Sequence, residues 1–180
     1  AGSDYDSVFA VILGTGVGAG FSLNKKIIVG PNKLTGEWGQ NPIPGPMDDY
    51  EKNVKRHCGR IGAIEVFLSG PGLENYYRYK TNSKKTSKEI VSLFNENNSH
   101  AIEVMDMYFE RIARSFSTFV NILDPDIIVC GGGMSEIDNI YDEIPKRIIP
   151  YIASNFFLTP IVKAKHGSSS GVRGAAYLWN

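Results

Sequence analysis

The chain has few cysteines, no excess of charge of either sign and no long apolar run. Its 180 residues include only Cys58 and Cys130, which are too few for a disulfide framework. Nineteen basic residues balance nineteen acidic ones, whereas a nucleic-acid-binding domain usually carries a basic face. No apolar stretch reaches the roughly 20 residues of a membrane span. These absences predict a cytoplasmic protein that binds neither nucleic acid nor a membrane.

What the chain does contain is enough patterned apolar sequence for one large core. A β-branched run over 7–13 and a second apolar run over 126–130 predict buried strands. Apolar side chains at three- and four-residue steps predict a helix over 99–123, which Pro125 ends. Further elements are expected as strands at 21–23, 27–29 and 161–164 and as helices within 64–79 (two pieces), at 87–95 (from a Ser cap), 141–152 and 171–179. This order is typical of an α/β lobe with a mixed sheet flanked by helices.

Two glycine-rich segments each follow a predicted buried strand. The first, Gly14-Thr15-Gly16-Val17-Gly18-Ala19-Gly20, is interpreted as a turn, and the second is Gly131-Gly132-Gly133. Glycines permit positive φ and let backbone N–H groups approach phosphate oxygens. Either segment alone is also compatible with a tight turn that binds nothing. Together they favour a nucleotide-binding cleft, because ligands of open α/β sheets lie at the carboxyl ends of strands.

A Gly- and Pro-rich loop over 36–46 carries the candidates for substrate binding. Glu37 and Gln40 lie three residues apart in it, so a carboxylate and an amide can hydrogen-bond neighbouring hydroxyls of a sugar. Bonds from hydroxyls to a carboxylate are strong because they are charge-assisted. Glu65 is a further candidate, although a carboxylate there is also compatible with a charge favoured at a helix N-terminus.

These segments resemble the ROK family of repressors and sugar kinases. The resemblance rests on 8–20, on 36–42, on 121–135 and on 163–176, which occur in family order along the whole chain. Within the family, the chain is most similar to bacterial fructokinase of the mannofructokinase type.

The resemblance implies an actin-like, ribonuclease-H-like ATPase fold of two lobes, of which residues 1–180 form the C-terminal lobe. The N-terminal lobe would lie outside this chain. The full-length enzyme would use ATP and Mg²⁺ to phosphorylate a hexose, with fructose favoured, at its 6-hydroxyl. A homodimer is also expected.

The resemblance further assigns contacts to individual residues. Those implied to contact the ATP phosphates are Gly14, Thr15, Gly16, Val17, Gly18, Ala19, Gly20 and Phe21. Those implied to lie near the adenosine are Gly131, Gly132 and Gly133. Those implied to contact sugar hydroxyls are Glu37, Gln40 and Glu65.

The chain departs from the family pattern in three places. The family's catalytic Asp lies upstream of residue 1, so no catalytic residue is assigned and the isolated chain is expected to be inactive. The four zinc-ligand positions hold Arg56, Cys58, Ala63 and Gln40. Because a structural zinc site needs four ligands, no structural zinc is expected, and packing would have to hold this loop. Ser168 replaces the usual acidic residue.

Other functions stay open at this point. One is a sugar-sensing transcriptional regulator of the same family, and another is a degenerate sugar-binding protein. Among kinases, N-acetylglucosamine, glucose and mannose are alternatives to fructose.

Overall fold

Alternate residues of the first strand are buried, which shows how the sheet is covered. The computed structural model describes residues 1–176. In strand β1 (Ser7–Leu13), Phe9, Val11 and Leu13 are buried, whereas Ile12 is 38% exposed. Successive side chains of a strand point to opposite faces. One face of the sheet is therefore packed and the other is partly open.

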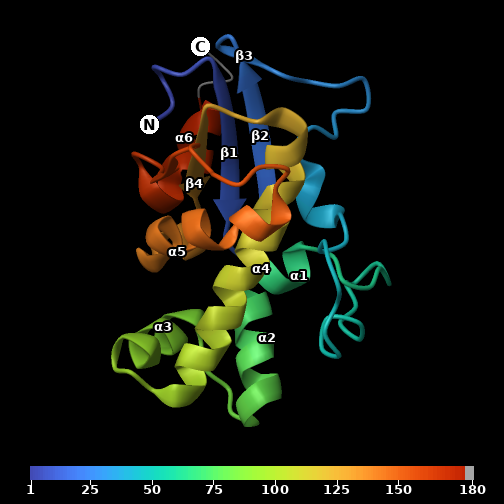
Figure 1. Ribbon diagram of the computed structural model, residues 1–180, viewed down its shortest axis with the longest axis vertical. Coiled ribbons are helices and arrows are strands. Elements are labelled where there is room, and N and C mark those ends of the chain that lie inside the picture. Colours follow the sequence, from blue (N-terminus) through green and yellow to red (C-terminus); the bar gives the residue numbers. More distant parts are fainter. Residues whose placement is uncertain (177–180) are drawn as a thin grey trace.

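Five strands of the described residues form one mixed sheet, in the order β3-β2-β1-β4-β5 (Figure 1). The other strands are β2 (Val17–Leu23), β3 (Lys26–Ile27), β4 (Ile127–Gly131) and β5 (Ile161–Lys163). β1, β2 and β3 pair antiparallel, whereas β1, β4 and β5 pair parallel. The predicted mixed sheet is confirmed.

Helices connect and cover these strands. The α-helices are α1 (Glu65–Leu68), α2 (Gly70–Thr81), α3 (Ser87–Asn95), α4 (Ser99–Leu123), α5 (Asn139–Arg147) and α6 (Ser170–Ala176). The 3₁₀ helices are η1 (Glu37–Gln40), η2 (Gly133–Glu136), η3 (Ile149–Tyr151) and η4 (Gly167–Ser169).

The long helix α4 joins the sheet to a helical end of the molecule. Its Phe119 ring stacks on Phe9 of β1, with ring centroids 3.9 Å apart. The helix then extends past the sheet to pack on α2 and α3 (Figure 1). The Asn98 side chain caps its start by accepting a hydrogen bond from the Ala101 N–H, and Asp124 ends it in the left-handed conformation. The predicted bounds are confirmed.

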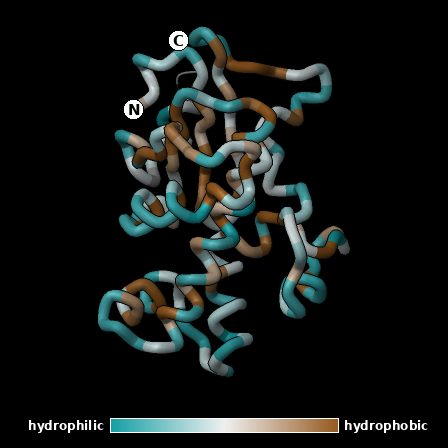
Figure 2. Tube along the Cα trace, in the orientation of Figure 1, coloured by the Kyte–Doolittle hydropathy of each residue, from teal (hydrophilic) through white to brown (hydrophobic). Residues whose placement is uncertain are grey.

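Many hydrophobic residues follow this packing, but several are exposed. Figure 2 shows them gathered on the strands, and also in the segment that follows β3. Ile27, the last residue of β3, is 71% exposed, and Val29, in the segment that follows, is 66% exposed. Ile102, which belongs to the predicted apolar stripe of α4, is also exposed. Apolar periodicity therefore located the helix but overstated its buried face by one residue.

The first glycine-rich segment is mostly strand, so its interpretation as one turn is wrong. The turn is tight and is confined to Gly14–Gly16, where the Gly14 N–H donates to the Gly16 carbonyl at 3.0 Å. From Val17 onward the chain pairs with β1, Ile12 lying opposite Gly18 and Ala10 opposite Gly20. Sheet pairing overrides the low strand propensity of glycine.

Several other details of the prediction differ from the structure. β3 covers Lys26–Ile27 rather than 27–29. α3 has the predicted bounds, Ser87–Asn95, but its cap is Thr86 rather than a Ser, and Thr86 forms a reciprocal capping box with Glu89. α5 spans Asn139–Arg147 rather than 141–152, since Pro150 has no N–H to continue the helix. The predicted last helix is present as α6, and its expected residues 177–179 lie outside the described part of the chain.

Candidate functional site

The two glycine-rich segments meet at the carboxyl ends of β1 and β4. Gly132 has φ +88°, and a Cβ added there would lie 2.3 Å from the Leu13 carbonyl oxygen. A Cβ on Gly14 would lie 4.0 Å from the Gly133 nitrogen. The Gly70 N–H at the start of α2 donates to the Gly14 carbonyl at 2.8 Å. The structure thus brings together two segments that are separated by more than a hundred residues of sequence.

Gly18 and Gly20 lie on the open face of the sheet. They pair with Ile12 and Ala10, and cross-strand partners share a face. Neither glycine has a positive φ, and a Cβ added to either would meet nothing within 4 Å. The fold of this chain therefore does not require glycine at these positions. Their missing side chains leave backbone accessible beside the Gly14–Gly16 turn.

A cavity of about 370 Å³ lies beside the second glycine segment. Gly133, Met134, Glu136 and Ile137 form one wall, and Ser87, Lys88 and Val91 of α3 form the other. Of the three glycines assigned to the adenosine, only Gly133 lines this cavity. Gly131 lies under Ile12, whose Cδ1 is 3.1 Å from where a Cβ would stand.

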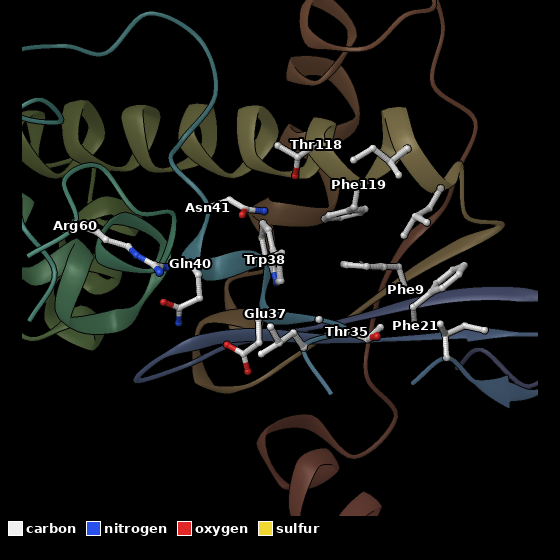
Figure 3. A pocket seen from close by; sticks show the side chains of 15 residues that line it. Phe9, Phe21, Thr35, Glu37, Trp38, Gln40, Asn41, Arg60, Thr118 and Phe119 are labelled. Carbon is white, nitrogen blue, oxygen red and sulfur yellow. The ribbon is translucent and has the colours of Figure 1, made fainter. Parts of the chain in front are cut away.

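A larger hollow of about 850 Å³ contains Glu37 and Gln40. Figure 3 shows their side chains with Arg60 at one end of the hollow and Phe9, Phe21 and Phe119 at the other. The hollow therefore has a polar end and an aromatic end.

Gly36 and Trp38 set the position of the polar end. Gly36 has φ +92°, and a Cβ there would lie 1.8 Å from the Ala19 carbonyl oxygen. This close approach fixes the start of η1 against β2. Trp38 is buried, and its ring packs edge-on against Phe116 and Phe119 of α4. Its Nε1 has no hydrogen-bond partner in the described part of the chain. Glu37 and Gln40, the first and last residues of η1, line the hollow.

Glu65 contacts the glycine turn instead of lining that hollow. It is the first residue of α1. Its Oε2 accepts from the Val17 N–H at 3.2 Å, and its Oε1 accepts from Arg56 Nε at 2.9 Å. The preceding residue, Ile64, donates its N–H to the Asn41 carbonyl just after η1. Glu65 therefore lies between the loop that carries Gln40 and the turn that leads into β2.

Residues 1–180 match the sequence model of the ROK family. The chain belongs to the ROK family. It is 39% identical to an N-acetyl-D-glucosamine kinase of Vibrio atlanticus and 35% identical to one of Yersinia enterocolitica. Each alignment covers 97% of this chain and 59% of the relative. The chain thus spans less than two thirds of these relatives' length. From the sequence we expected a likeness to fructokinase, but these relatives are N-acetyl-D-glucosamine kinases.

Solved ROK structures share the fold. A ROK family glucokinase from Streptomyces griseus, in complex with glucose and AMPPNP, superposes with a TM-score of 0.86 at 22% identity. The match covers 99% of this chain and 62% of that one. A ROK hexokinase from Thermus thermophilus gives a TM-score of 0.84 at 22% identity, covering 99% and 59%. The predicted actin-like fold class is confirmed.

The loop over 56–63 contains three of the positions that hold zinc ligands in the family pattern. In this chain, polar contacts hold that loop. The Arg56 N–H donates to the Arg60 carbonyl at 2.8 Å, and Lys55 forms a bridge with Ile61. The Arg56 side chain binds Glu65, which raises the pKa of the guanidinium. The expectation that packing would hold this loop did not include these polar contacts.

Cys58 lies exposed in the same loop. The backbone N–H of Arg60, and then the Arg56 side chain, lower the pKa of its thiol. Among residues 1–176, no three of His, Cys, Asp and Glu gather as metal ligands do. The expected absence of structural zinc stays a prediction, as does the effect of Ser168, which lies in η4.

Sequence reasoning missed a buried ion-pair cluster behind the site. Glu51, 0% exposed, accepts from Arg111 Nε at 2.8 Å and from Arg114 Nη1 at 3.1 Å. Arg114 Nε also donates to the Pro44 carbonyl at 2.8 Å. The cluster therefore ties the segment after η1 to α4. The local sequence signal for this cluster was the presence of two arginines among the apolar residues of α4. Their partner Glu51 lies about 60 residues earlier in the chain, so local sequence does not reveal the pairing.

None of the described helices is both long enough and apolar enough to cross a bilayer.

Proposed function

We propose that this chain is the C-terminal lobe of an ATP-dependent hexose kinase that phosphorylates N-acetylglucosamine at its 6-hydroxyl. The position of Glu65 carries the proposal. Its carboxylate binds the N–H of Val17 beside the glycine turn, while its own segment pairs with the end of η1. A sugar held by Glu37, Gln40 and Glu65 would therefore lie next to phosphates held by that turn.

The glycine-rich segments support the nucleotide half of this proposal. The backbone of Gly14 to Phe21 would hold the phosphates, and the open strip over Gly18 and Gly20 leaves them room. The cavity beside Gly133 would hold the adenosine. ATP supplies the phosphoryl group and Mg²⁺ offsets the charge of its phosphates. We assign no Mg²⁺ ligand among the described residues. Their part is to position the phosphates and to supply N–H donors.

The polar end of the large hollow supports the sugar half. The carboxylates of Glu37 and Glu65 would accept from hydroxyls. The Gln40 amide both donates and accepts, which suits an acetamido group as well as a hydroxyl. Sequence identity of 39% to an N-acetyl-D-glucosamine kinase supports this sugar as our first candidate, ahead of fructose, glucose and mannose.

Steady-state kinetics of the full-length protein test the proposal with ATP and four sugars: N-acetylglucosamine, glucose, mannose and fructose. We expect the highest kcat/KM with N-acetylglucosamine. Glu37→Gln should lower it about 10- to 100-fold, since a hydrogen bond to a charged group is worth about 1.5–3 kcal/mol. The matched control is Glu96→Gln, an exposed carboxylate of the helical end, which should leave kcat/KM unchanged.

Other outcomes would redirect the assignment. Preferred turnover of fructose would restore the fructokinase interpretation. Sugar binding without turnover of any hexose would contradict the kinase proposal and favour a sugar-sensing regulator or a degenerate binding protein. The 180-residue chain assayed alone should phosphorylate none of the four sugars, because the proposal places the catalytic Asp in the other lobe. The expected homodimer and cytoplasmic location remain predictions.

A further inference from the structure

The Glu65 carboxylate is fixed from two sides. Arg56 Nε binds Oε1 at 2.9 Å and the Val17 N–H binds Oε2 at 3.2 Å. Both paired side chains are mostly covered, with 16% of Arg56 and 22% of Glu65 exposed. A carboxylate has about four acceptor positions. Two are used within the chain, so about two remain to accept hydrogen bonds from a bound molecule.

The glycine turn leaves room for this carboxylate. A Cβ on Gly16 would lie 3.1 Å from Glu65 Oε2, which is closer than most real side chains approach. Glu65 is therefore seated directly against the backbone of the turn. A rotation of its side chain would change the contact with Val17 and the direction in which its free acceptor positions point.

Arg56 is itself held rigidly enough to act as a support. Its backbone N–H is bonded to the Arg60 carbonyl, and Gly59 closes the turn between them with φ +87°. Its Nη1 donates to Cys58 Sγ at 3.6 Å. The guanidinium thus reaches Glu65 from a loop whose backbone is already fixed, and little freedom is lost in making the pair.

We propose that Arg56 is a positioning residue that holds the Glu65 carboxylate in the orientation needed to accept a hydroxyl of the sugar. This rests on the proposed function, because it takes Glu65 as a sugar ligand. Arg56 does not touch the substrate in this proposal, and it acts through Glu65 alone. The ion pair stands at a loop position where the family resemblance places a zinc ligand, so charge pairing does the orienting here.

The experiment compares full-length wild type with Arg56→Met, Arg56→Lys, Glu65→Gln and the Arg56→Met/Glu65→Gln double variant. The sugar is whichever hexose the wild type turns over best. We expect Arg56→Met to raise the KM for sugar about tenfold while the KM for ATP and kcat change less than twofold. Arg56→Lys should recover part of the loss, since lysine keeps the charge but not the planar fork. The double variant should be no worse than Glu65→Gln.

Each alternative result has a distinct meaning. If Glu65→Gln leaves the KM for sugar unchanged, the proposed sugar contact of Glu65 fails, and the role of Arg56 fails with it. If Glu65→Gln raises that KM but Arg56→Met does not, only the positioning role is overturned. A purely structural role would lower the thermal midpoint and raise both KM values, additively with Glu65→Gln. Arg78→Met, which removes an exposed arginine of α2, is the matched control.

Discussion

Gly36 and Gly18 both lie in the region of the site, but the fold of the chain requires glycine only at position 36. Gly36 has a positive φ, and a Cβ would overlap the backbone of Ala19. Gly18 has neither constraint, and an added Cβ would stand in open space. A glycine that its own fold does not require is best explained by close approach of something else to the backbone. In the proposed function that is the phosphate chain of ATP.

Gly18→Ala should therefore separate binding from stability. We expect its thermal midpoint to stay within about 1 °C of wild type, because the methyl group meets no atom of the chain. ATP affinity, measured by calorimetry on the full-length protein, should fall about tenfold, the equivalent of one lost charge-assisted hydrogen bond.

Two further variants make this result interpretable. Gly36→Ala should lose at least about 2 kcal/mol of unfolding free energy, because the left-handed conformation and the overlap both penalise a side chain. Gly30→Ala, in the segment after β3 and outside the glycine-rich segments, should change neither quantity. Undiminished ATP affinity in Gly18→Ala would mean that no ligand approaches this strip.

A buried charge cluster joins helix α4 to the loop that contains Glu51, and the apolar spacing of the sequence does not predict it. Glu51 is surrounded by Arg111 and Arg114, and the Arg111 guanidinium lies 4.0 Å from the centre of the Tyr76 ring. A buried charge is costly unless it is paired. The cluster therefore fixes the loop that contains Glu51 to the middle of α4. Through the Pro44 carbonyl it also fixes the segment after η1.

Glu51→Gln should destabilise the fold strongly. Two arginines that are almost fully covered would lose their shared carboxylate, and breaking a buried pair costs about 3–5 kcal/mol. Urea unfolding followed by circular dichroism measures the loss. Asp49→Asn is the matched control, because it removes an ion pair with Lys52 in which Asp49 is 93% exposed, and such pairs contribute about 0–1 kcal/mol. Equal effects of the two substitutions would contradict a stabilising cluster.

The same elements show how far the sequence alone reaches. The bounds of β1 and α4 could be predicted because their apolar spacing is local and regular. Only the end of β2, at 21–23, could be predicted, since the glycines between 16 and 20 resemble a turn until pairing with β1 is known. Glu37 and Gln40 line the same hollow, because they share one short loop, and their contacts with a sugar stay a prediction. The contacts of Glu65 with Val17, and of Glu51 with α4, join residues 48 to 63 positions apart. Only the folded chain brings them together.

At the scale of the whole molecule, the two cysteines make the stability depend on pH in opposite directions. Burial raises the pKa of the Cys130 thiol from its ordinary 9.0 to about 12. Hydrogen bonds lower the pKa of the exposed Cys58 thiol. A group whose pKa is higher in the folded state stabilises the fold fully at pH values below its pKa in the unfolded state. This stabilisation is lost as pH rises toward its pKa in the folded state. A group whose pKa is lower in the folded state stabilises the fold at pH values above its pKa in the unfolded state. This stabilisation is lost as pH falls through its pKa in the folded state.

Alkaline unfolding should therefore begin with Cys130. As pH rises above about 9, the unfolded chain ionises this thiol while the folded core cannot, so the free energy of unfolding should fall. In Cys130→Ala this decline should be shallower up to about pH 10, where tyrosines and lysines begin to titrate. Urea midpoints measured between pH 7 and 10.5 test this. Cys58→Ala is the control and should make the decline slightly steeper. Parallel curves for Cys130→Ala and wild type would contradict the prediction, since the buried thiol would then contribute nothing to the pH dependence.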